Sequence, residues 1–162
     1  MRVSSLPKVV VAEDSLPDIP RQHSNPTRWQ GEHWGDFVQA LQDVGIKIRE
    51  NKFETGVYIT AAGGLAHGLP HGVVIAKSAE QIAHLMQLAQ KFEVPVTTRG
   101  GGLTTEGESV AFGGVLLDMT GMSRVLEVDK NALTVRTQAG ISWHHLAEHI
   151  RRDGLDYLSA PL

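Results

Sequence analysis

The sequence predicts an α+β fold that begins with a strand–helix–strand unit and continues into a small mixed sheet with flanking helices. Three observations carry this prediction. Between residues 73 and 98, a β-branched run, an amphipathic stretch and a second strand pattern follow one another. Strand patterns at 125–128 and 133–136 flank a short polar turn, which is typical of a hairpin. An amphipathic helix is predicted from Ser142 to about Arg152.

Length and composition fit one globular domain and exclude several classes of function. The chain has 162 residues, of which 41% are hydrophobic and 20% are charged, and its net charge is −3. This balance favours neither nucleic acid nor an anionic membrane as a partner. The sequence contains no cysteine, which removes thiol nucleophiles and cysteine-based metal sites. No apolar run resembles a signal peptide or a membrane span, and we expect a cytoplasmic protein.

The chain divides into three regions. Residues 1–28 contain four prolines with little apolar periodicity, and they are predicted to form an extended or disordered arm. Residues 29–69 are predicted to form a helix from Glu32 to Lys47 and then an irregular, glycine-rich connection, with Gly45 as a helix stop. Residues 70–162 form the predicted lobe.

The strand–helix–strand unit has clear local signals. Val73–Ala76 is the first strand, and Ser78 is a good N-cap for the helix that follows. Apolar residues then recur on one helix face, namely Ile82, Leu85, Met86, Leu88, Ala89 and Phe92. The second strand covers 95–98, and its short connection through a helix predicts that the two strands are parallel. A further strand is predicted at 115–118.

Three consecutive glycines, Gly100–Gly102, directly follow the second strand. Without Cβ atoms, such a segment can turn several backbone N–H groups toward an anion, although a flexible turn is the alternative. Neither familiar phosphate motif fits. A dinucleotide fingerprint needs a small residue at Thr105 and a helix there, and a P-loop needs lysine at Glu108. Arg99 is a candidate either for contact with phosphate or for pairing with Glu106 or Glu108.

The run from Arg99 to Met119 resembles the pyrophosphate loop of the vanillyl-alcohol-oxidase type (PCMH-type) FAD-binding domain. Its spacing is similar without gaps to the motif of cytokinin-dehydrogenase-like oxidoreductases, R-G-x-G-H-S-x-x-G-Q-x-x-A-x-G-G-V-V-x-D-M. The resemblance covers about residues 70–155 and includes the hairpin and the last helix. It implies that this lobe binds FAD.

The resemblance also implies a set of cofactor-binding residues. Backbone groups from Gly100 to Thr104 would wrap the FAD diphosphate, with the Thr104 hydroxyl in place of the family's serine. Gly107 would turn the chain back, Glu108 replaces the usual glutamine, and Ala139–Gly140 would lie near the cofactor. The complete predicted set is Arg99, Gly100, Gly101, Gly102, Leu103, Thr104, Thr105, Gly107, Glu108, Ala139 and Gly140. Many members of the family attach FAD covalently through a histidine where this chain has Leu103, so non-covalent FAD is expected.

The family continues into a second FAD-binding lobe and a substrate domain, whereas this sequence ends at Leu162. We therefore expect a truncated first lobe that belongs to a flavoprotein oxidoreductase, in which hydride passes from a substrate to the flavin and then to oxygen or another acceptor. A second polypeptide or a homodimer would complete the fold. The alternatives are a non-catalytic lobe that acts as an assembly or interaction module, and a binder of another phosphate-bearing ligand such as a nucleotide.

The last helix carries histidines at a spacing that metal sites use. His145 and His149 have the i, i+4 spacing that lets two imidazoles share a metal, with His144 and Glu148 beside them. No third convergent ligand is evident, which favours a solvated helix face. We predict no metal, and no catalytic residue can be argued from spacing.

Overall fold

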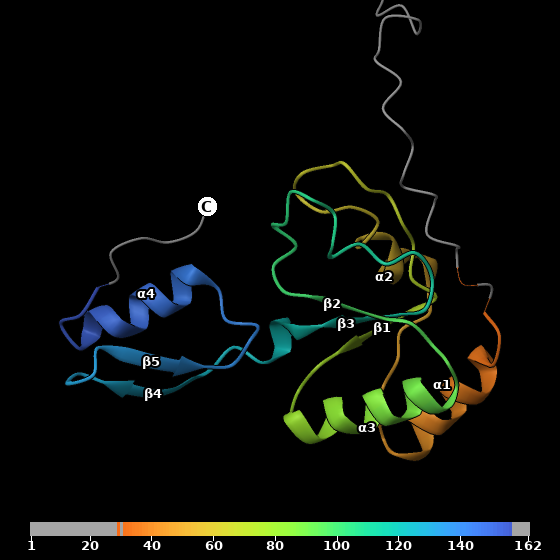
Figure 1. Ribbon diagram of the computed structural model, residues 1–162, viewed down its shortest axis with the longest axis horizontal. Helices are drawn as coiled ribbons and strands as arrows, with labels where there is room; N and C mark the ends of the chain where they lie inside the picture. Colours follow the sequence, from red (N-terminus) through yellow and green to blue (C-terminus); the bar gives the residue numbers. More distant parts are fainter. Residues whose placement is uncertain (1–28, 30, 157–162) are drawn as a thin grey trace, which may run out of the picture.

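The computed structural model describes residues 29 and 31–156, and the predicted arm at 1–28 lies outside the described residues (Figure 1). The predicted α+β class is confirmed. In chain order the elements are α1 (Trp34–Asp43), α2 (Lys52–Gly56), β1 (Gly72–Ile75), α3 (Ala79–Lys91), β2 (Val96–Arg99), β3 (Val115–Asp118), the 3₁₀ turn η2 (Met119–Gly121), β4 (Val125–Asp129), β5 (Thr134–Thr137) and α4 (Trp143–Arg152). None of the helices in this part of the chain is long and apolar enough to cross a membrane.

Parallel and antiparallel pairing are divided between two sheets. The first sheet has the strand order β1-β3-β2, and both pairs are parallel. This confirms that β1 and β2 run parallel, and it places β3 between them. The second sheet is the hairpin of β4 and β5, which pair antiparallel.

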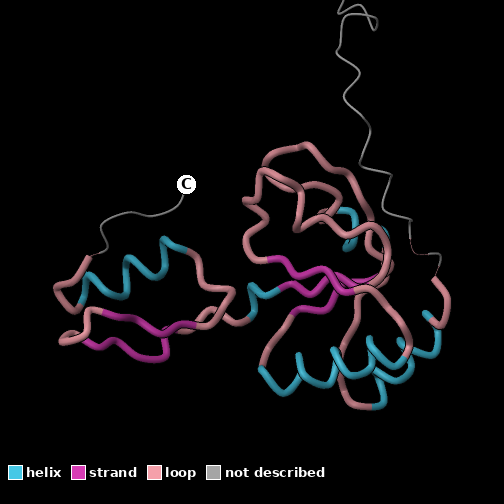
Figure 2. Tube along the Cα trace, in the orientation of Figure 1, coloured by secondary structure: helices cyan, strands magenta, loops and turns pink. Residues whose placement is uncertain are grey.

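Different structures cover the two faces of the parallel sheet. Helices α1 and α3 cover one face, whereas α2 and the irregular segments before β1 and after β2 lie over the other (Figures 1 and 2). Because side chains alternate along a strand, Leu117 of β3 packs among Phe37 and Leu85 on the helical side. Its neighbour Leu116 packs with Val73 on the opposite side. The sheet therefore has a buried surface on both faces, as parallel sheets require.

The helices agree with their predicted caps more closely than with their predicted lengths. Helix α3 begins as expected at Ser78, whose Oγ accepts a hydrogen bond from Gln81 N at 3.2 Å. The predicted helix over 32–47 is too long, because α1 ends at Asp43 and Gly45 adopts a left-handed φ of 77°. The chain then turns inward, and Ile46 becomes part of the core. Helix α2 lies between the predicted helix and the glycine-rich connection, and it was not predicted.

The hairpin and α4 form a small unit beside the first sheet (Figure 1, blue). Asp129 Oδ1 accepts hydrogen bonds from the N–H groups of Asn131 and Ala132, both at 2.9 Å, and these contacts stabilise the turn. Helix α4 begins at the expected cap, since Ser142 Oγ accepts from His145 N at 3.2 Å. Its buried face consists of Leu146, Ala147 and Ile150.

Candidate functional site

The carboxyl edge of the parallel sheet is where the sequence-predicted site residues meet. The glycine-rich loop leaves this edge at the end of β2, and η2 leaves it at the end of β3. Gly140 packs against the backbone of Met119 in η2 so closely that an added Cβ would overlap the Met119 carbonyl. The structure thus brings Ala139–Gly140 to the edge from which Gly100 departs. In open α/β sheets, ligands bind outside the carboxyl ends of the strands.

The glycine-rich loop is fixed through its carbonyl groups and leaves its N–H groups unused. Gly102 O accepts a hydrogen bond from Ala62 N at 2.9 Å, and Thr104 O accepts one from Gly63 N at 3.2 Å. Among the residues that the structure describes, the N–H groups from Gly100 to Thr105 donate to no protein acceptor. Unpaired backbone donors in such number mark a segment that is satisfied by water or by a ligand.

Two of the loop glycines differ in what a side chain at their position would meet. Gly102 adopts a φ of 71°, which favours glycine, and an added Cβ would overlap the guanidinium of Arg99 in its present position. Gly100 has no such requirement, because no atom lies within 4 Å of an added Cβ. The absent side chain at Gly100 instead leaves open space beside the unpaired N–H groups. Open space next to several backbone donors fits an anionic diphosphate.

Arg99 lies against the loop and is held there by residues far away in the sequence. Its Nη1 donates to Thr60 O at 2.9 Å, and its guanidinium carbon lies 5.5 Å from the centre of the Tyr58 ring. Within the described residues Arg99 pairs with neither Glu106 nor Glu108, so that alternative is wrong. Its contact with phosphate stays a prediction.

A buried carboxylate lies next to this arginine. Asp118, which is 5% exposed, is the register partner of Arg99 across β2 and β3. Its Oδ1 accepts from Thr120 N at 2.8 Å and from Thr120 Oγ1 at 2.7 Å, and its Oδ2 accepts from the Tyr58 hydroxyl at 2.7 Å. Burial, followed by the hydrogen bond to Asp118, raises the pKa of Tyr58 to about 12. The phenol therefore stays protonated and donates a hydrogen bond to Asp118.

The other predicted loop residues occupy a mixed environment. The Leu103 side chain is 69% exposed, and Thr105 and Glu108 are exposed as well. The Thr104 hydroxyl lies 2.7 Å from that of Ser109, which is buried. Gly107 is buried with a φ of 87°, in agreement with the turn expected there.

Several residues that shape the site were missed by the sequence analysis. Tyr58 and Thr60 hold Arg99, Ala62 and Gly63 bind the loop carbonyls, and Ser109 bonds to Thr104. Only Gly63 carried a signal, as part of a glycine-rich connection, and an added Cβ there would overlap the Thr105 carbonyl. Ser109 lies only five residues after Thr104, whereas the contacts of Tyr58, Thr60 and Ala62 join residues about forty positions apart, which no local pattern reveals.

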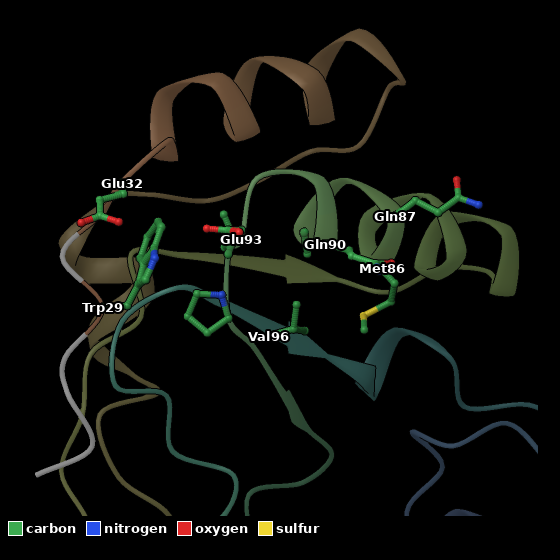
Figure 3. Close-up of a pocket in the computed structure, with 10 residues that line it drawn as sticks. Trp29, Glu32, Met86, Gln87, Gln90, Glu93 and Val96 are labelled. Carbon is green, nitrogen blue, oxygen red and sulfur yellow. The ribbon is translucent and has the colours of Figure 1, made fainter. Parts of the chain in front are cut away.

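Two other features lie away from this edge. A groove of about 960 Å³ runs between α3 and β2, and its lining includes Trp29, Met86 and Val96 but no residue of the loop (Figure 3). On α4, His144 Nε2 lies 3.6 Å from Glu148 Oε1, and both side chains are largely exposed. No group of three or more potential metal ligands occurs in the part of the chain that the structure describes.

A parallel sheet whose carboxyl edge carries a loop of unpaired N–H groups has the arrangement expected of a lobe for a phosphate-bearing cofactor. Comparison with known sequences makes this class specific. The chain belongs to the FAD binding domain family, whose sequence pattern matches residues 70–161. FAD is the cofactor of this domain, which confirms the predicted cofactor. The finer resemblance to cytokinin-dehydrogenase-like enzymes stays a prediction.

Curated relatives share part of this sequence, and a solved structure shares its fold. The mitochondrial D-lactate dehydrogenase [cytochrome] of Arabidopsis thaliana is 32% identical over 56% of this chain and 16% of its own length. The D-2-hydroxyglutarate dehydrogenase of Escherichia coli is 31% identical over 78% of this chain and 13% of its own. A structure of alkyldihydroxyacetonephosphate synthase superposes with a TM-score of 0.69 at 24% identity, covering 78% of this chain and 28% of that one. The chain thus spans a minor part of each of these proteins.

Proposed function

We propose that this chain binds FAD non-covalently by placing the cofactor's diphosphate against the N–H groups of residues 100–105. The run of unpaired N–H groups carries the proposal, since backbone donors to an anionic oxygen form short, strong hydrogen bonds. Positive charge is scarce there, because Glu106 and Glu108 outweigh Arg99, so the backbone supplies most of the attraction. Leu103 offers no nucleophilic atom for attachment to the flavin.

The remaining predicted residues are proposed to complete the diphosphate site. Ala139 and Gly140 would border the cofactor, which is supported by their position at the carboxyl edge of the sheet. The Thr104 hydroxyl would take the role of the family's serine, with Ser109 orienting it. Glu108, in the place of glutamine, would face solvent beside the diphosphate.

We further propose that residues 70–162 form the first FAD-binding lobe of a flavoprotein oxidoreductase. In such enzymes FAD accepts a hydride from the substrate and passes the electrons to oxygen or another acceptor. This chain would contribute the diphosphate site, and the groups that shape the substrate pocket would come from a further polypeptide or a second copy of the chain. A cytoplasmic location stays a proposal from the composition.

One absorption measurement tests the proposed binding of FAD. The purified chain is mixed with FAD and desalted, and its visible absorption spectrum is recorded. A retained flavin band that is released by acid precipitation is the expected result, and a folded chain without any flavin band would contradict the proposal. ADP and ATP as competitors separate FAD from simpler nucleotides, and the mass in solution with and without FAD tests the second copy.

A further inference from the structure

The contacts around Tyr58 form a continuous chain from the core to the glycine-rich loop. The Tyr58 hydroxyl is anchored on buried Asp118, and the Tyr58 ring lies against the Arg99 guanidinium. Arg99 in turn donates to Thr60 O, and its guanidinium fills the space that a side chain at Gly102 would need. A single aromatic side chain thus connects the central strand to the loop.

The position of Arg99 is unusual for a cation beside a carboxylate. Arg99 and Asp118 occupy paired register positions on the same face of the sheet, yet neither takes part in an ion pair within the described residues. The Tyr58 phenol and Thr120 occupy the Asp118 oxygens instead. Arg99 is thereby left to support Gly102 and to hold the Thr60 carbonyl.

The hold on Thr60 reaches the loop by a second route. Thr60 begins the short segment 60–63. Its last two residues, Ala62 and Gly63, donate through their N–H groups to the carbonyls of Gly102 and Thr104. Fixing Thr60 therefore fixes the donors that hold the loop carbonyls. A planar guanidinium suits this task, because it presents several donors in a rigid fork and stacks on an aromatic ring.

We propose that Tyr58 is a positioning residue for the diphosphate loop and that it acts through Arg99, which supports the loop from the protein side instead of binding the diphosphate. This inference rests on the proposed FAD binding for its effect on affinity. Its structural part, that Tyr58 and Arg99 fix segment 60–63 against the loop, is independent of any ligand.

Amide hydrogen exchange on the full chain without FAD tests the structural part. The amides of Ala62 and Gly63 are protected by the loop carbonyls, so loss of the support should raise their exchange rates about tenfold in Tyr58→Leu and Arg99→Lys. Tyr58→Phe keeps the ring and should recover part of the protection. Thr120→Val is the matched control, since it removes another hydrogen bond to Asp118 without touching Arg99. Unchanged protection in Tyr58→Leu and Arg99→Lys, or equal loss in Thr120→Val, would overturn the proposal.

FAD titration of the same variants tests the functional part. We expect a Kd for FAD about tenfold higher in both Tyr58→Leu and Arg99→Lys. Because Arg99 is proposed not to touch the diphosphate, removing its charge in Arg99→Gln should leave the salt dependence of FAD binding unchanged. If Arg99→Lys binds FAD as tightly as the unaltered chain while Arg99→Gln loses both affinity and salt dependence, Arg99 touches the diphosphate and the proposal is wrong. An unaltered chain that binds no FAD would refute the proposed function, whereas the exchange result would still decide whether Tyr58 positions the loop.

Discussion

Replacement of Gly100 by alanine separates the binding of FAD from the stability of the fold. No protein atom lies within 4 Å of the Cβ that Gly100→Ala would add, and the backbone there is not in the left-handed region. The variant should therefore be as stable as the unaltered chain or more stable by about 0.4–1 kcal/mol, because alanine restricts the unfolded chain.

FAD affinity should fall in the same variant. The new methyl group would project into the space beside the unpaired N–H groups, where we place the diphosphate. Loss of one hydrogen bond to a charged group costs about 1.5–3 kcal/mol, which corresponds to a Kd roughly 10- to 150-fold higher. Fluorescence titration of FAD gives the affinity, and thermal unfolding without FAD gives the stability.

Two further alanine variants provide the comparison. Gly56→Ala in α2 adds a Cβ that also meets no atom, far from the loop in sequence, and it should leave FAD binding unchanged. Gly102→Ala should lose both stability and binding, since a left-handed alanine costs about 1–2 kcal/mol and its methyl group overlaps Arg99. The reasoning is refuted if Gly100→Ala binds FAD as tightly as the unaltered chain.

Three other predictions concern stability. Leu85→Ala should lower the free energy of unfolding by about 2–5 kcal/mol, because Leu85 is fully buried, whereas its exposed neighbour Met86 should tolerate alanine in the same denaturant titration; equal losses would contradict the assigned helix face. Ser142→Ala should cost about 1 kcal/mol by removing the N-cap of α4, visible as a lower Tm, and an unchanged Tm would argue against the cap. Tyr58→Phe should cost about 1–3 kcal/mol at neutral pH by leaving an Asp118 oxygen unpaired. Since the folded pKa of Tyr58 is raised from 10 to about 12, the advantage of the unaltered chain over Tyr58→Phe is complete below pH 10 and declines as the pH rises from 10 to 12; an advantage that stays constant over that range would speak against the raised pKa.

The sequence predicts the features of this fold that depend on local patterns. The start of α3 at Ser78 and of α4 at Ser142 follow from capping residues placed before amphipathic runs. The position of β3 between β1 and β2 was not predicted, because strand order depends on contacts across the sheet and not on any local period. The end of α1 was overestimated because Val44 continues the apolar spacing, although it is the exposed C-cap residue of α1 and is followed by the left-handed Gly45.

The same distinction applies to the site. The loop glycines were found because they are consecutive and follow a strand, and the resemblance assigned them a ligand. The support of Arg99 could not be found in this way, since it requires Tyr58 and Thr60 to return to the loop from about forty residues upstream. The sequence predicted what the loop binds, whereas the structure shows what holds it.

The loop also determines how the sheet can be assembled. Residues 100–114 connect β2 to its parallel neighbour β3, so the chain must return from the carboxyl edge to the amino edge, about 13 Å for four strand residues. In many parallel folds a helix makes this crossover, whereas here the return part packs Val110 and Ala111 into the protein. Within the parallel sheet, β3 is the last strand to be synthesised and the central one in space. A ligand held at residues 100–105 is thus attached to the connection that sets the strand order. The loop should therefore bind its ligand tightly only after β3 has entered the sheet.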